Sequence, residues 1–294
     1  MKSLKGVFTA LITPFKNQKV DFASLEKLID QQVKGDVDGF VINGTTAESP
    51  TLKTAEREEI FKFIKNKVGS QKILIFGTGS NDTEKTVQDS LRAQELGADA
   101  LLVVVPYYNK PPQRGLVAHF SKIATAVELP ILLYNVPGRT VASLSADSIA
   151  ELSRVKNIVG IKEATGDIQF LKEIKKKSVE QFIFLSGDDG TYVEFLKAGG
   201  HGVISVTSHV FPKAMKKWSE QVALGQSELA LADFEKYKKI TELLFCEANP
   251  IPVKAALQML NIIEKDELRL PLVKLEDKWR KPILDELKKL ALLK

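Results

Sequence analysis

The sequence has little cysteine and histidine and no long apolar run. Cys246 is the only cysteine in 294 residues, which excludes an internal disulfide and a cysteine-based metal cluster and favours a reducing compartment such as the cytoplasm. Three histidines show no metal-ligand spacing with carboxylates. No stretch reaches the roughly 18 apolar residues of a membrane span, and the first residues lack the apolar core of a signal peptide. We expect no metal site and no membrane association.

Neither the basic nor the acidic residues are concentrated in one part of the sequence. Lys and Arg total 42 against 37 Asp and Glu, a net charge of +5, and the basic residues alternate with acidic ones. The densest basic cluster, 172–177, contains Glu173 and is typical of an exposed helix face. We therefore expect no nucleic-acid partner.

Short apolar runs alternate with amphipathic segments up to about residue 224. Because these runs lack polar alternation, they indicate a parallel sheet covered by helices, and eight β-then-α units in order favour a closed (β/α)8 barrel, the TIM barrel of the α/β class. The expected strands are Val7–Thr13, Gly39–Asn43, Ile73–Gly77, Ala100–Val105, Ile131–Tyr134, Ile158–Lys162, Phe182–Ser186 and Gly202–Val206. The expected helices between them include Thr83–Leu96, Gly115–Val127 and Pro212–Ala223.

The pattern changes after the eighth unit to helices alone. We expect helices at about Glu228–Phe245, Val253–Leu260 and Asp277–Leu293, with Asn249-Pro250-Ile251-Pro252 forming a rigid turn between the first two. The sequence thus predicts a catalytic barrel over residues 1–224 and a C-terminal helical appendage over residues 225–294.

Lys162 interrupts a run that otherwise reads as a buried strand, Ile158-Val159-Gly160-Ile161-Lys162-Glu163. A lysine in an apolar setting tends to lose its proton, and the neutral amine adds to carbonyl groups to form a Schiff base. Alternatively, the stem of an edge lysine lies on the sheet while its head reaches water. The first interpretation predicts covalent chemistry on a keto or aldehyde substrate.

Barrel enzymes carry their chemistry in the loops after the strands, and several polar side chains fall there. Tyr134 could serve as a proton relay or as a packing residue, and the Gly44-Thr45-Thr46 turn could be catalytic or a helix cap. The guanidinium of Arg139 suits a carboxylate ligand, although a surface ion pair is equally consistent with the sequence. Asp188-Asp189 is more typical of a helix cap than of a metal site.

Taken together, these segments resemble the 4-hydroxy-tetrahydrodipicolinate synthase family, also called dihydrodipicolinate synthases, of the pyruvate-dependent class I aldolase and lyase superfamily. The resemblance spans essentially the whole chain. The motifs that carry it, in family order, are Gly44-Thr45-Thr46-Ala47-Glu48-Ser49, Tyr134-Asn135-Val136-Pro137-Gly138-Arg139-Thr140, Gly160-Ile161-Lys162-Glu163-Ala164-Thr165, Ser186-Gly187-Asp188-Asp189 and Asn249-Pro250-Ile251-Pro252-Val253-Lys254.

The resemblance implies that Lys162 forms a Schiff base with pyruvate, and that the enamine attacks the aldehyde of L-aspartate 4-semialdehyde in lysine and diaminopimelate biosynthesis. It implies a proton relay of Tyr134, Thr45 and Tyr108, with Tyr108 supplied by a neighbouring subunit, and hence a dimer at least and commonly a homotetramer. No metal, nucleotide or flavin cofactor is implied. The implied substrate contacts are Thr46 for the pyruvate carboxylate, Arg139 for the aldehyde's carboxylate, and Gly187 and Ile204 for the pocket wall.

Two alternatives remain at this point. N-acetylneuraminate lyases and keto-deoxy sugar acid aldolases share the lysine and the tyrosine but lack the arginine of this loop, which is present here as Arg139. A barrel that only binds a keto acid, as a sensor or scaffold, would lack a member of the lysine, tyrosine, threonine and arginine set, and none is missing.

The resemblance breaks down at the lysine-binding cleft of feedback-inhibited relatives. The family's histidines and glutamate are replaced here by Thr54, Arg57 and Lys85, whereas Ser49, Asn81 and Tyr107 remain. Added positive charge disfavours a cationic effector, so we expect weak or absent inhibition by lysine.

Overall fold

A closed barrel of eight parallel strands forms the framework of the protein. The computed structural model describes residues 3–293, and the strand order around the barrel is β1-β10-β9-β8-β7-β6-β5-β4. The predicted α/β barrel is therefore confirmed. The strands are β1 (Gly6–Ala10), β4 (Gly39–Ile42), β5 (Ile73–Gly77), β6 (Ala100–Val104), β7 (Ile131–Asn135), β8 (Ile158–Glu163), β9 (Ile183–Ser186) and β10 (Gly202–Ser205); a small hairpin, β2 (Phe15–Lys16) and β3 (Lys19–Val20), was not predicted.

Every barrel strand is buried along almost its whole length, as the unbroken apolar runs predicted. Parallel strands covered on their outer face by helices have no solvent face, so polar alternation is absent. The expected and observed strand boundaries agree to within two residues, apart from β1, which ends at Ala10 rather than Thr13.

Contacts divide the chain into two compact units. The middle unit consists of the residues up to Gly6 together with Ile73–Ile204, and the flanking unit consists of Val7–Lys72 with the chain from Ser205 onward. The predicted division at residue 224 into barrel and appendage stays a prediction.

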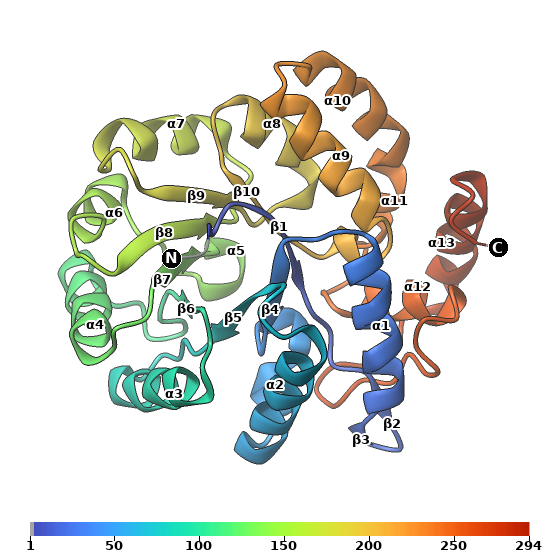
Figure 1. The fold of residues 1–294 in the computed structure, drawn as a ribbon, viewed down its shortest axis with the longest axis horizontal. Coiled ribbons are helices and arrows are strands. Elements are labelled where there is room, and N and C mark those ends of the chain that lie inside the picture. Colours follow the sequence, from blue (N-terminus) through green and yellow to red (C-terminus); the bar gives the residue numbers. More distant parts are fainter. Residues whose placement is uncertain (1–2, 294) are drawn as a thin grey trace. The chain divides into compact units, whose positions relative to one another are not determined.

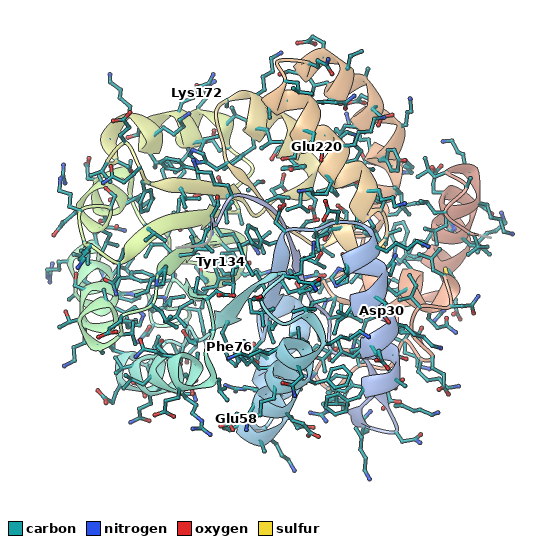
Figure 2. The ribbon with its side chains drawn as sticks, viewed as in Figure 1. Asp30, Glu58, Phe76, Tyr134, Lys172 and Glu220 are labelled. Carbon is teal, nitrogen blue, oxygen red and sulfur yellow. The ribbon has the colours of Figure 1, made fainter. Side chains whose placement is uncertain are left out.

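In the middle unit the helices lie outside the strands. Figure 1 shows α3, α4, α6 and α7 along the outer side of β5 to β9, and Figure 2 shows Lys172 of α7 pointing away from the strands. The predicted exposed face at 172–177 is confirmed, because only Ile174 is buried among these residues. The helices are α3 (Thr83–Leu96), α4 (Gln113–Ala126), α5 (Pro137–Thr140), α6 (Ala146–Leu152), α7 (Ile168–Lys177), the 3-10 turn η3 (Asp189–Thr191) and α8 (Tyr192–Lys197).

The flanking unit corrects two predictions about the C-terminal helices. The helix expected at Glu228–Phe245 is broken by a 3-10 turn at Glu235–Tyr237. A 3-10 turn stacks side chains three apart, and Phe234 and Tyr237 both pack on the Trp218 ring, at centroid distances of 5.2 and 5.3 Å. The helices are α1 (Phe22–Lys34), η1 (Thr45–Ala47), η2 (Ser49–Thr51), α2 (Thr54–Val68), η4 (Thr207–His209), α9 (Pro212–Ala223), α10 (Ser227–Phe234), η5 (Glu235–Tyr237), α11 (Lys238–Leu243), α12 (Ile251–Met259) and α13 (Asp277–Lys289).

The second correction concerns the proline-rich turn. Helix α12 begins at Ile251, so Pro252 lies inside its first turn and only Asn249 and Pro250 precede the helix. Proline is tolerated in a first turn because the amide there has no intrahelical partner. The turn between α11 and α12 is therefore shorter at its C-terminal end than the sequence indicated.

The register between β7 and β8 contains one irregularity. Ile131 pairs with Ile158, but Leu132 pairs with Gly160, so Val159 is an extra residue in β8. Beyond this bulge Tyr134 pairs with Lys162 and Asn135 with Glu163. Because paired residues in adjacent strands face the same side of the sheet, Tyr134 and Lys162 share one face, and Asn135 and Glu163 share the other.

A fully buried histidine in the flanking unit ties folding to pH. His209 Nε2 accepts a hydrogen bond from the Ile12 amide at 3.2 Å, and Nδ1–H donates to the Val206 carbonyl at 2.8 Å. A second ring proton would sit on Nε2 and point at the Ile12 N–H, where it would replace the hydrogen bond by a clash of two donors. Burial lowers the pKa of His209 from its usual 6.5 to about 4.

We expect acid to destabilise the protein through His209. The unfolded chain binds a proton near pH 6.5 and the folded one only near pH 4, so the stabilisation is complete above 6.5 and falls between 6.5 and 4. The loss is on the order of 3 kcal/mol. The free energy of unfolding in urea should fall less between pH 7 and pH 4.5 in a His209→Gln variant than in the unaltered protein. An equal fall in both proteins would contradict this.

Candidate active site

Lys162 is a buried amine next to a phenol. The residue lies near the end of β8, is 7% exposed, and its Nζ lies 4.2 Å from the centroid of the Tyr134 ring. Among residues 3–293 no carboxylate forms an ion pair with it. The alternative of an edge lysine with its head in water is therefore wrong, and the amine is not held by a counter-ion that would compete with a carbonyl substrate.

Gly187 provides the space for this lysine. A Cβ placed on Gly187 would lie 2.8 Å from Lys162 Cε and 2.6 Å from the Ala164 Cβ, distances that real Cβ atoms do not tolerate. The Gly187 amide donates to the Glu163 carbonyl at 2.6 Å and so fixes the start of the loop after β9 beside β8. Only glycine fits here without moving the lysine side chain. Ile204, in β10 of the same unit, is 2% exposed.

The opposite face of the same strand pair holds a polar brace that the sequence analysis did not identify. Asn135 Nδ2 donates to Glu163 Oε2 at 2.8 Å, and its Oδ1 accepts from the Leu144 amide at 3.0 Å. Glu163 Oε1 accepts from the Thr165 amide at 2.6 Å. Burial raises the pKa of the Glu163 carboxyl, and the hydrogen bonds from Asn135 and Thr165 oppose that rise. The brace locks the strand ends that carry Tyr134 and Lys162.

Arg139 is exposed directly after β7. It lies in the short helix α5, whose Thr140 hydroxyl bonds the carbonyls of Val136 and Ala142 at 3.0 and 2.6 Å. Within the described part of the chain the Arg139 side chain has no ion pair or hydrogen bond, so the surface ion pair considered above is not present. A planar guanidinium without a protein partner is suited to bind a carboxylate.

The loop after β6 exposes two tyrosines. The side chain of Tyr108 is 85% exposed and that of Tyr107 is 39% exposed. Tyr108 has a backbone φ of 80°, a conformation that is uncommon for an aromatic residue and clusters at functional sites. The phenol of Tyr108 is thus directed to the surroundings of the chain rather than into its core.

Thr45 and Thr46 belong to the flanking unit, where they follow β4. Thr45 is exposed, whereas Thr46 is buried and its Oγ1 accepts a hydrogen bond from Asn249 Nδ2 at 2.8 Å. Gly44, the residue that starts the turn, offers no side-chain cap. The helix-cap interpretation of this segment is therefore wrong. Asp188, by contrast, caps η3 through the Thr191 amide at 3.0 Å, as the sequence indicated.

The two cationic side chains at the positions of the expected lysine-binding cleft make contacts within their own segments. Arg57 donates to the carbonyls of Leu52 and Ser49 at 3.3 and 3.4 Å, and Lys85 pairs with Asp89 at 3.1 Å. Thr54 is the first residue of α2, and Asn81 precedes α3. Over residues 3–293, no group of three His, Cys, Asp or Glu side chains is arranged to hold a metal ion. No helix in that range has the length and apolarity needed to cross a membrane.

The family model, the related sequences and the similar solved structures all indicate the same family. The model of the Dihydrodipicolinate synthetase family matches residues 3–290. The 4-hydroxy-tetrahydrodipicolinate synthase of Bdellovibrio bacteriovorus is 58% identical over 293 residues, which cover 100% of both chains. The chloride-inhibited dihydrodipicolinate synthase from Acinetobacter baumannii, solved with pyruvate, is 40% identical with a TM-score of 0.96 over 99% of this chain and 100% of that one. A monomeric dihydrodipicolinate synthase variant is 40% identical with a TM-score of 0.96 over 98% of this chain and 97% of that one.

Proposed function

Because the chain belongs to the dihydrodipicolinate synthetase family, we infer that it condenses pyruvate with L-aspartate 4-semialdehyde to 4-hydroxy-tetrahydrodipicolinate, the first committed step of lysine and diaminopimelate biosynthesis. The observation that carries this inference is the contact of the buried Lys162 amine with the Tyr134 ring. An amine without a counter-ion beside a phenol has what Schiff-base chemistry needs, a nucleophile and a proton carrier.

The steps balance without an added oxidant or reductant. Lys162 Nζ attacks the ketone carbon of pyruvate, and the carbonyl oxygen leaves as water. Loss of a methyl proton gives the enamine, whose carbon attacks the aldehyde of the second substrate. The amino group of that substrate then attacks the imine carbon, the ring closes, and Lys162 is released. Two substrates thus yield one product and one water.

Hydroxyl groups are the proposed proton donors and acceptors in these steps. We propose that Tyr134, beside the amine, exchanges protons with Thr45 and with Tyr108 of a neighbouring subunit. The exposure of Tyr108 and its positive φ support a phenol that is used outside its own chain. This role requires a dimer at least, and we propose a homotetramer built as a dimer of dimers. One solved relative is a monomeric dihydrodipicolinate synthase variant.

Substrate binding is proposed for four residues. Thr46 contacts the pyruvate carboxylate, Arg139 binds the carboxylate of the aldehyde substrate, and Gly187 and Ile204 line the pocket beside the lysine. The unpaired guanidinium of Arg139 supports its role, and the clearance at Gly187 supports a wall that touches the Lys162 stem. Activation of the carbonyl by an amine requires no metal or nucleotide. We propose a cytoplasmic enzyme, in agreement with its single cysteine.

A direct assay tests this function. The protein is incubated with pyruvate and either L-aspartate 4-semialdehyde or a sugar aldehyde, and the products are identified by mass spectrometry. We expect product only with the semialdehyde. Turnover of the sugar aldehyde alone would instead favour an aldolase acting on sugar acids.

We expect weak or absent feedback inhibition by lysine. Positions that bind the effector in lysine-inhibited relatives hold Thr54, Arg57 and Lys85 here, and two of these side chains are cationic. Arg57 is bonded to carbonyl groups of its own loop, while the charge of the exposed Lys85 is only partly offset by Asp89. Activity should be unchanged by millimolar L-lysine, and strong inhibition at that concentration would show that the electrostatic argument is wrong.

A further inference from the structure

A charged pair with no access to solvent lies in the flanking unit. The side chains of Glu48 and Lys254 are 1% and 0% exposed, and Lys254 Nζ donates a hydrogen bond to Glu48 Oε1. The same nitrogen donates to the Glu267 carbonyl at 2.8 Å and lies 4.3 Å from the centroid of the Phe15 ring. We call these two side chains the Glu48–Lys254 pair.

The second carboxylate oxygen of the pair is also occupied. Glu48 Oε2 accepts from the Arg269 amide at 2.9 Å. The Arg269 guanidinium binds both Glu56 oxygens, at 2.6 and 2.9 Å, and donates to the Thr51 carbonyl at 2.9 Å. The chain around residues 267–269 is thereby attached to the segment 48–56, more than two hundred residues away in sequence.

These contacts converge on the segment that carries Thr45 and Thr46. Thr46 Oγ1 accepts a hydrogen bond from Asn249 Nδ2, and the Ala47 carbonyl accepts one from the Thr13 hydroxyl at 2.8 Å. Glu48, the next residue, adopts a left-handed conformation with φ 57° and ψ 37° at the junction of η1 and η2. A buried, non-glycine residue in this conformation persists only where its surroundings determine it.

Stability alone does not account for the pair. Desolvating two charges commonly costs as much as their attraction returns, so apolar residues of the same volume are as stable or more stable. Burial lowers the pKa of Lys254 to about 8 even though Glu48 opposes the shift, which shows how strongly this site disfavours the ammonium. The advantage of such a pair is a fixed geometry.

We propose that the Glu48–Lys254 pair, together with Asn249, positions the Thr45 and Thr46 hydroxyls for the condensation. The proposal rests on the function inferred above. Glu48, Asn249 and Lys254 are positioning residues that act through the two threonines. Because a misplacement of about 1 Å in a reacting group can cost about 100-fold in rate, loosening this segment should affect turnover far more than pyruvate adduct formation.

The test compares Lys254→Met, which keeps the apolar stem, with Lys254→Met/Glu48→Gln, which leaves no unpaired buried charge. Lys16→Met, which breaks an exposed pair with Glu264 in the same unit, is the matched control. For each folded variant we measure kcat, the KM for pyruvate, the thermal midpoint, and the adduct trapped on Lys162 by borohydride at saturating pyruvate. We expect kcat/KM to fall about 10- to 100-fold in both Lys254 variants with the adduct still trapped, and no change in the control.

A double-mutant cycle separates positioning from loss of stability. Thr45→Val alone should lower kcat, and the same change in the Lys254→Met/Glu48→Gln background should add little, because the hydroxyl is already displaced. Independent, multiplicative losses would overturn the proposal, as would wild-type kcat and KM in either folded Lys254 variant. If neither variant folds, Asn249→Ala with Thr46→Val provides the same cycle without changing a charge.

The function and the positioning role fail in different ways. Absence of product and of adduct in the unaltered protein would refute the proposed function and the inference with it. Normal turnover in the unaltered protein combined with multiplicative losses in the cycles would refute the positioning role alone.

Discussion

Lys162→Ala is expected to abolish borohydride trapping of pyruvate and to lower turnover by about 10⁴-fold or more, the scale seen when a catalytic nucleophile is removed. The reason is the position of the amine, which is buried beside Tyr134 and not paired with a carboxylate in the described chain. Peptide mass mapping after reduction locates the adduct. In the unaltered protein it should lie on the peptide that contains Lys162.

Lys172→Ala is the matched control for this experiment. Lys172 lies in the same unit on the exposed face of α7, so its removal should leave both trapping and turnover unchanged. An adduct at full strength in the Lys162→Ala variant would assign the Schiff base to another amine and remove the basis of the proposed mechanism.

Tyr134→Phe is expected to reduce kcat by about 10²- to 10⁴-fold, the range of a lost general acid–base group. The substitution keeps the ring against which Lys162 packs and removes only the phenol oxygen. Since Tyr134 O–H has no hydrogen-bond partner among residues 3–293, the folded state loses little, and the thermal midpoint should change by no more than a few degrees.

Steady-state kinetics with both substrates measure this effect. Tyr237→Phe removes a phenol from an aromatic cluster of the flanking unit while keeping its ring contacts, and it should leave kcat unaffected. Unchanged turnover in Tyr134→Phe would show that the phenol carries no proton in the rate-limiting step.

Local patterns in the sequence predict the barrel and the reactive pair. Strands buried on both faces are apolar throughout, so a single lysine in β8 stands out, and Tyr134 marks the end of the neighbouring strand. Their spacing along the chain also suffices to place them on adjacent strands, because consecutive β-then-α units pair in order in a barrel.

Contacts between distant segments are what the sequence does not reveal. Asn249 is bonded to Thr46, and Lys254 to Glu48, across more than two hundred residues, and neither pair leaves a periodic signal. The break in the helix after residue 234 could not be predicted for a related reason. The local pattern continues as helix, whereas the 3-10 turn accompanies a contact of Tyr237 with Trp218, a residue outside the local window.

The bulge at Val159 has a consequence for how such enzymes can change. Had Val159 paired with Leu132 as an ordinary ladder residue instead of bulging, Lys162 would lie opposite Asn135 and turn to the other face of the sheet. Whether Val159 bulges or pairs therefore decides which face of the sheet carries the Lys162 amine. A descendant in which Val159 joined the ladder would retain each reactive side chain in its sequence and still be an inert barrel, whereas one that lost Val159 would keep Lys162 opposite Tyr134.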